Sequence, residues 1–159
     1  MIRCTFHLNG QGLSILSCPG VGFFPAYSGN SGPHRNNPGS AMIRDVGPLP
    51  RGTYYIVKRA RGGVRSKVNS AVKSWWTGSD HSTWFSLYRA DGVIDDLTLV
   101  GSVNRKNFRL HPAGREGISE GCITLPSPYH FDLLRKALLS TPEYLVAPGL
   151  RAYGTIRVY

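Results

Sequence analysis

The 159-residue sequence has few acidic residues, few cysteines and no long apolar run. No apolar stretch approaches the ~20 residues that a membrane-spanning helix requires. The N-terminal stretch MIRCTFHLNGQGLSIL also lacks the apolar centre of a signal peptide, because His7, Asn9 and Gln11 interrupt it. The sequence therefore predicts a chain without a membrane span, made in the cytoplasm without a signal peptide.

Acidic residues are outnumbered, with nine Asp and Glu against nineteen Lys and Arg, for a formal net charge of +10. This excess favours a polyanionic partner or surface. The basic residues are dispersed, however, with no block of five like charges and no recognisable nucleic-acid-binding module. We expect no nucleic-acid partner. For the charge taken alone, a solvated basic surface and contact with an anionic bacterial envelope both remain open.

Metal-binding spacings such as HExxH and CxxC are absent, and His34 and the Asp80-His81 pair stand isolated. We therefore expect no metal and no cofactor, and we interpret these histidines as solvated loop residues.

The three cysteines lie unequally along the chain. Cys4 and Cys18 flank the turn-rich NGQG, and a hairpin closing around Gln11 would bring them opposite each other. A disulfide and two ordinary buried cysteines are both compatible with this spacing. With a disulfide there, Cys122 would remain a free thiol.

The composition is that of a folded protein, with 41% hydrophobic residues, and 19 Gly and 11 Pro that indicate frequent turns. We expect a single domain over residues 1–159, mostly β with two short amphipathic helices. Alternating or β-branched patterns predict strands at 2–8, 12–17, 53–57, 108–110, 122–125 and 154–159. Residues 84–100 are expected to form two strands joined as a hairpin at Asp91-Gly92.

Helical spacing of apolar residues predicts one helix over 66–76 and another over 127–139, the latter opened by Ser127-Pro128. Residues 19–50 are dense in Gly, Pro, Ser and Asn. A loop of this length is uncommon unless it covers or lines a site, or is disordered. We expect it to be ordered by its aromatic residues and to line a cleft.

The stretch 108-FRLHPAGREGISEGCITL-125 holds the candidate chemistry. A cysteine attacks as the thiolate, so a catalytic cysteine needs a base, and His111 could serve Cys122 in that way. Gly121 would let two backbone amides approach a carbonyl oxygen as an oxyanion hole. Free cysteines are more often structural, and the spacing alone leaves both readings open.

The residue pattern is more specific. FRLHP followed by SEGCITL resembles the active-site signature of L,D-transpeptidases, in which a histidine precedes a Ser/Thr-His-Gly-Cys tetrad. It is most similar to the divergent branch found among type VI secretion effectors, the Tlde1 group. Upstream, SCPGVGFFPAYSGN, RNNP, GPLPRGTYYIV and FSLYRADG also resemble that branch in order and placement. The resemblance implies the β-sandwich-like catalytic fold of L,D-transpeptidases.

The resemblance also implies roles. Cys122 would attack the amide between the third residue of a peptidoglycan tetrapeptide stem and its terminal D-alanine, with His111 as general base and acid. The carbonyl of Pro112 would orient the histidine ring. Ser119 and Gly121 would shape the loop and the oxyanion hole.

The chain departs from the broad family at two residues and in one spacing. Glu120 replaces the histidine of the tetrad, Thr124 stands where Arg or Asn is common, and the gap between histidine and cysteine is shorter. A carboxylate at 120 could hold a charged His111 electrostatically. Arg109 would lie on the same side of its strand as His111, so it is our candidate for binding the substrate carboxylate, with a solvated arginine as the alternative.

The resemblance implies an antibacterial effector that is carried by a type VI secretion apparatus into the periplasm of a target bacterium and is blocked by a cognate immunity protein. Water as acceptor would make it an L,D-carboxypeptidase, and a D-amino acid or a stem amine an L,D-transpeptidase. The alternatives are a peptidoglycan amidase or endopeptidase that uses the same cysteine and histidine, and a non-enzymatic basic binding protein.

Overall fold

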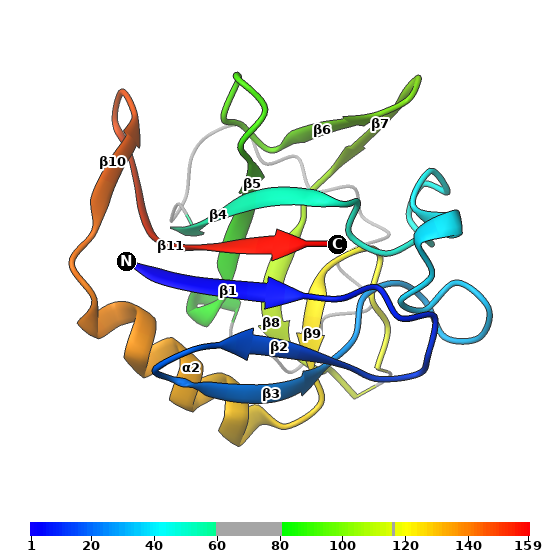
Figure 1. Ribbon diagram of the computed structural model, residues 1–159, viewed down its shortest axis with the longest axis horizontal. Coiled ribbons are helices and arrows are strands. Elements are labelled where there is room, and N and C mark those ends of the chain that lie inside the picture. Colours follow the sequence, from blue (N-terminus) through cyan, green and yellow to red (C-terminus); the bar gives the residue numbers. More distant parts are fainter. Residues whose placement is uncertain (60–80, 116) are drawn as a thin grey trace.

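The computed structural model describes residues 1–59, 81–115 and 117–159, and strands are its main regular elements (Figure 1). The main sheet contains β1 Ile2–Phe6, β2 Ser14–Cys18, β3 Gly22–Ala26, β4 Gly52–Lys58, β5 Phe85–Arg89, β8 Arg109–Pro112, β9 Ile123–Leu125, β10 Tyr144–Ala147 and β11 Leu150–Val158. The expected mostly-β fold class is confirmed.

The main sheet is nearly closed on itself. Its strands follow the order β3-β2-β1-β11-β4-β5-β8-β9, with β10 paired to β11. The two ends of this path meet because Tyr27, directly after β3, exchanges backbone hydrogen bonds of 2.9 and 2.8 Å with Thr124 of β9. This curvature joins the β3 and β9 ends of the path and encloses one cluster of buried apolar side chains.

The hairpin expected at the N-terminus is present, since β1 and β2 pair antiparallel. A disulfide joins Cys4 of β1 to Cys18 of β2, which decides the alternative that the sequence left open. Cys122 is a buried free cysteine. The three cysteines therefore divide into one cross-link and one thiol.

The predicted helix at 127–139 is confirmed as α2, Pro128–Ser140. It begins there because the Ser127 side chain accepts a hydrogen bond from the His130 amide, with proline in the first turn. It buries Phe131, Leu134 and Leu138, which lie on one face at helical spacing. The other predicted helix, at 66–76, lies outside the described residues.

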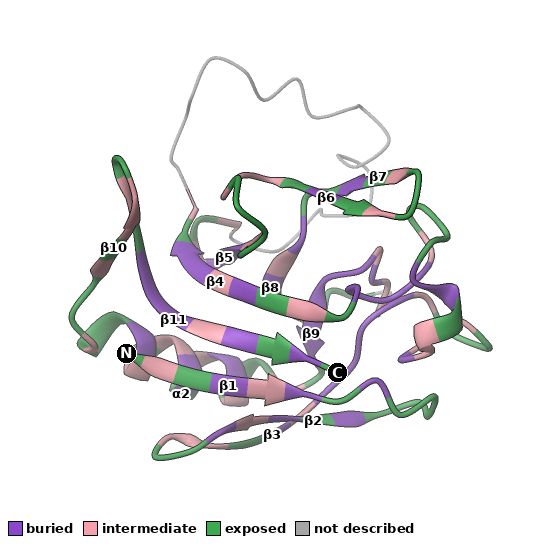
Figure 2. Cartoon of the chain, turned by 45° about the horizontal axis from the view of Figure 1, so that its top comes forward, coloured by how far each residue is buried: buried purple, intermediate pink, exposed green. Residues whose placement is uncertain are grey.

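The predicted hairpin at Asp91-Gly92 is wrong. On the edge of β5 that faces away from β4, Phe85 and Ser86 pair with β8, and the Leu87 amide donates to the Phe108 carbonyl at 3.0 Å. The next strand, β6 Leu97–Val100, pairs instead with β7 Val103–Lys106 in a separate two-stranded sheet. Figure 2 shows this sheet beside the main sheet, with exposed and partly buried residues around one buried residue in each strand, Thr98 and Arg105.

The segment 19–50 is more regular at its start than expected, because β3 pairs with β2 over residues 22–26. Beyond β3 it contains the short 3-10 turn η1, Pro38–Ser40. Its irregular part is pinned by Asn36, a buried residue with φ of 53°. The Asn36 side chain accepts from the Ser28 amide at 2.8 Å and donates to the Gln11 carbonyl at 2.8 Å.

Candidate active site

Two short parallel strands bring the predicted nucleophile and base together. β8 and β9 pair with Leu110 opposite Ile123 and His111 opposite Thr124. Leu110 and Ile123 belong to the apolar cluster, so the alternate residues His111, Cys122 and Thr124 share the other face. The Cys122 thiol donates to the Asn107 carbonyl, with sulfur and oxygen 3.8 Å apart. The histidine and the cysteine of the motif therefore lie on the same side of the β8–β9 pair.

The ring of His111 is oriented as the resemblance implied. Its Nδ1 donates to the Pro112 carbonyl at 2.7 Å, so the proton of the neutral ring resides on Nδ1 and Nε2 is left as the basic atom. Nε2 lies 3.3 Å from the hydroxyl oxygen of Thr124. The imidazole also stacks on Trp84, with ring centroids 4.4 Å apart and an interplanar angle of 21°.

Burial decides the charge state of the pair. It lowers the pKa of His111 to about 4, against a smaller opposing effect of the Pro112 carbonyl. It raises the pKa of Cys122 to about 11, although the Arg109 charge and the backbone hydrogen bond from Arg109 act in the other direction. Near neutral pH the resting site therefore holds a thiol and a neutral imidazole, which suits general-base catalysis.

The residues that lead into Cys122, described over 117–122 and called the cysteine loop below, are held by the segment that follows β3. The Ser119 hydroxyl donates to the Cys122 carbonyl at 2.8 Å and accepts from the Gly29 amide at 3.2 Å. The Ser28 hydroxyl donates to the Gly121 carbonyl at 3.2 Å. Ser119 and Gly121, both predicted to shape this loop, thus lie within it and are held by the 19–50 segment.

The start of the same loop is held by an arginine and a tyrosine. Tyr27 and Arg35 both donate to the Gly117 carbonyl, at 2.9 and 3.0 Å. The Arg35 guanidinium also lies over the Tyr27 ring, 4.0 Å from its centroid. The segment 19–50 therefore contacts the cysteine loop and β9 at several points, from Gly117 to Thr124.

Gly121 has a steric reason to be glycine. Its φ is +106°, a conformation that residues with a side chain rarely adopt. A Cβ at this position would lie 2.5 Å from Nη2 of Arg105 and 2.7 Å from the Phe108 ring. The close approach of Arg105 is possible only because position 121 has no side chain.

Arg109 and Glu120 interact with groups that the sequence did not point to. Both terminal nitrogens of Arg109 bind the Asp96 carboxylate, at 2.8 Å each. Arg109 stays a prediction as a substrate ligand, since a substrate carboxylate would compete with Asp96. Glu120 is partly buried, and burial together with the nearby Asp45 raises the pKa of its carboxyl. Its charge acts on Cys122, raising the pKa of that thiol.

A model of the Tlde1 domain family matches residues 22–149, which include the histidine, the cysteine and the segment that holds their loop. The chain belongs to the Tlde1 domain family. This membership supports assignment of the protein to the Tlde1 group of type VI secretion effectors. Searches of curated proteins and of solved structures found no match.

Two residues of this Tlde1 domain that contact the site, Trp84 and Arg105, were not found by sequence reasoning, and a third, Thr124, was noted only as a departure from the broad family. Trp84 and Thr124 contact His111, and Arg105 contacts the cysteine loop. Nothing in the sequence distinguishes Arg105 from the other basic residues, because its partners are backbone carbonyls. His81, expected to be a solvated loop residue, is instead partly buried, and its ring lies tilted by 38° against that of Trp84 with centroids 4.5 Å apart.

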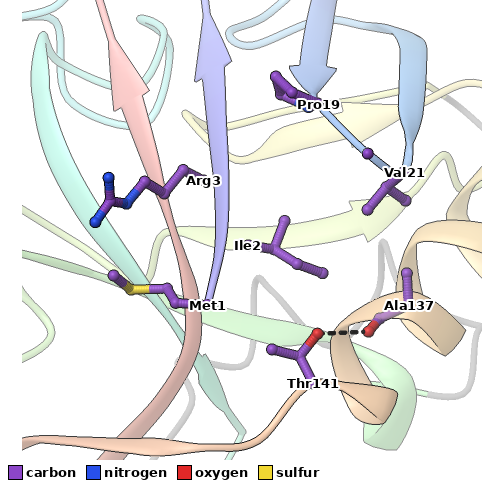
Figure 3. Close-up of a pocket in the computed structure, with 8 residues that line it drawn as sticks. Met1, Ile2, Arg3, Pro19, Val21, Ala137 and Thr141 are labelled. Carbon is purple, nitrogen blue, oxygen red and sulfur yellow. Dashed lines mark hydrogen bonds between the residues drawn. The ribbon is translucent and has the colours of Figure 1, made fainter.

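Other features of the Tlde1 domain lie apart from this site. A hollow of about 700 Å³ is lined by residues of β1, α2 and the turn after β2, and none of the predicted site residues borders it (Figure 3). Among residues 1–59, 81–115 and 117–159, no three His, Cys, Asp or Glu gather as metal ligands. Within the same residues, no helix is long and apolar enough to cross a membrane.

Proposed function

We propose that this Tlde1-family protein is an antibacterial enzyme acting on peptidoglycan tetrapeptide stems through a Cys122 thioester, as an L,D-carboxypeptidase and L,D-transpeptidase. One observation supports this above all others. Cys122 and His111 lie on one face of two adjacent strands, with Nδ1 of the histidine bound to a carbonyl and Nε2 left as the base. A cysteine nucleophile needs a base beside it, and this shared face supports His111 as that base.

In the first half-reaction, Nε2 of His111 takes the proton of the Cys122 thiol. The thiolate attacks the carbonyl carbon of the third stem residue and gives a tetrahedral oxyanion. The C–N bond to D-alanine then breaks, and the imidazolium returns the proton to the leaving amine. The products are free D-alanine and a thioester between Cys122 and the shortened stem.

In the second half-reaction, Nε2 takes a proton from the acceptor while the acceptor attacks the thioester carbonyl. The C–S bond breaks and the thiol regains its proton. Water as acceptor yields a tripeptide stem, a D-amino acid yields an exchanged stem, and a side-chain amine yields a cross-link. By family resemblance, we propose water and D-amino acids as the acceptors, since both outcomes deprive the wall of normal cross-links.

Thr124 supports His111 in both of its protonation states. A hydroxyl is both donor and acceptor. It can therefore donate to Nε2 of the neutral ring and, after rotation, accept from Nε2–H of the charged ring. Because the Thr124 backbone is hydrogen-bonded to Tyr27 in both directions, its side chain is held at a fixed position beside the ring.

The net charge and the disulfide of the protein fit action in the periplasm of a target bacterium. A net charge of +10 favours contact with an anionic envelope. The disulfide between Cys4 and Cys18 suits an oxidising compartment such as the periplasm. We propose that the protein acts there after type VI delivery and that a cognate immunity protein blocks its site.

Purified protein incubated with disaccharide tetrapeptide and read by mass spectrometry tests the proposal. Loss of one D-alanine is expected from the wild type and from Cys4→Ser/Cys18→Ser, the matched control that removes the other two cysteines. Cys122→Ala is expected to release none. A cut elsewhere in the stem would indicate an amidase or endopeptidase, and no cut with retained binding would indicate a binding protein.

Toxicity gives a second readout of the same proposal. Wild-type protein directed to the periplasm is expected to be toxic and Cys122→Ala harmless. Equal toxicity of the two would refute the catalytic role. Toxicity of Cys122→Ala in the cytoplasm would point to nucleic acid instead.

A further inference from the structure

Arg105 is an unusual residue because its guanidinium is buried and bonded to backbone carbonyls. It is 2% exposed. Its terminal nitrogens donate to the carbonyls of Ala41, Gly47 and Pro48 in the 19–50 segment and, at 3.2 Å, to that of Glu120. Burying a charge costs several kcal/mol unless it is fully hydrogen-bonded. Packing alone therefore does not explain why an arginine occupies this buried position.

Three successive carbonyls of the cysteine loop are each held by a side chain. Arg105 holds the carbonyl of Glu120, Ser28 holds that of Gly121, and Ser119 holds that of Cys122. The chain contains no cis peptide bond among its described residues. In a trans peptide the carbonyl and the following N–H point in opposite directions. Fixing the first two carbonyls therefore directs the amide hydrogens of Gly121 and Cys122 away from Arg105 and Ser28.

Those two amide hydrogens are available. Among the described residues, no turn or loop backbone hydrogen bond uses the amide hydrogen of Gly121 or of Cys122. Gly121 has a positive φ. Successive amides around a residue in a left-handed conformation form concave sites that bind anions. One of these N–H groups belongs to the nucleophile itself and the other to the residue directly before it.

We propose that Arg105, assisted by Ser28, is a positioning residue that orients these two amides as the oxyanion hole of Cys122. Arg105 does not touch the substrate. Its four carbonyl bonds tie the cysteine loop to the 19–50 segment, and its approach to Gly121 leaves no room for a side chain there. The Phe108 ring, 5.0 Å from the guanidinium carbon, supports it from one side. This inference rests on acyl transfer at Cys122, as proposed above.

Two small reagents separate an oxyanion effect from a general effect on the thiol. p-Nitrophenyl acetate acylates a thiol through a tetrahedral oxyanion, whereas iodoacetamide alkylates it without one. The ratio of the two rates, compared with that of N-acetylcysteine, therefore measures the oxyanion hole without using the natural substrate. Thermal unfolding of each variant checks that it folds.

Arg105→Lys is expected to lower the acylation rate about 10-fold or more and to leave alkylation within about twofold, since losing one oxyanion donor costs ~10²–10³ in rate. Ser28→Ala should lower acylation by a smaller factor, and it serves as the test should Arg105→Lys fail to fold. Arg89→Lys is the matched control, because Arg89 also bonds backbone carbonyls, those of Arg51 and Leu99, without touching the cysteine loop. Both of its rates should match wild type.

Three results would overturn the inference. These are unchanged acylation in the folded variants, an equal fall of acylation and alkylation, and a wild-type rate ratio no higher than that of N-acetylcysteine. D-alanine release from tetrapeptide is measured separately. A wild type that shows the expected ratio but releases no D-alanine would refute the proposed substrate and leave the role of Arg105 standing.

Discussion

The charge state of the resting site can be tested directly through the reactivity of Cys122. Burial raises the pKa of this thiol to about 11, so the thiolate fraction at pH 7 is ~10⁻⁴. Burial also lowers the pKa of His111 to about 4, so the imidazole is neutral there. The structure thus predicts a neutral pair. A preformed thiolate–imidazolium pair would be the alternative.

The assay is the rate of iodoacetamide alkylation as a function of pH. Because Cys4 and Cys18 are joined in a disulfide, one label per chain is expected, and none in Cys122→Ala. For a neutral pair the rate should rise about tenfold per pH unit, ~10³-fold from pH 7 to pH 10. His111→Asn should change it by no more than about threefold at pH 8.

Acyl transfer should respond differently to the same substitution. General-base catalysis contributes ~10²–10⁴-fold, so D-alanine release should fall by that factor in His111→Asn while alkylation hardly changes. A plateau of the wild-type alkylation rate between about pH 5 and pH 8, lost in His111→Asn, would refute the reasoning. It would show that the ion pair forms before substrate arrives.

Three further predictions concern stability. The unfolded chain binds more protons than the folded one between the ordinary pKa of His111, 6.5, and its folded value of about 4. The free energy of unfolding should therefore fall as pH drops through this window, by up to about 1.4 kcal/mol per pH unit, and urea titrations of His111→Asn should lack this component. Reducing the Cys4–Cys18 disulfide, which spans 14 residues, should lower the unfolding free energy by about 3 kcal/mol, measured in Cys122→Ser to prevent thiol exchange; an unchanged urea midpoint would contradict this. The Asp96–Arg109 pair, with side chains 33% and 15% exposed, should show a coupling of about 1–2 kcal/mol in a double-mutant cycle of Asp96→Asn and Arg109→Met, and additive effects would count against it.

Local sequence signals predicted the elements whose stability is local. Alternation of apolar residues marked most of the strands, and Ser127 followed by proline marked the start of α2. The turn-rich NGQG between two alternating segments predicted the β1–β2 pair. These signals act over a few residues, so the rest of the chain does not change them.

Pairing between strands was predicted less well, because it depends on which edges are free. Asp91-Gly92 is a strong hairpin signal, yet β8, a strand from later in the chain, pairs with β5 on the edge where the hairpin partner would lie. The strand β3 was missed because its proline and glycine suggest irregular structure, while its partner β2 supplies the ladder. Neither outcome can be derived from a local pattern.

For the candidate site, the sequence by itself determined the pair of residues to examine, since His111 and Cys122 stand in a motif whose order resembles a known family. The match of the Tlde1 family model over residues 22–149 confirms the resemblance to the Tlde1 group. Only the tertiary structure decided how the pair is supported. Arg105, Ser28 and Thr124 act through hydrogen bonds to backbone or ring atoms distant in sequence. Such contacts cannot be predicted from a sequence pattern, because every residue has a backbone carbonyl that could accept the bond. Donor and acceptor meet only when the nearly closed sheet has formed.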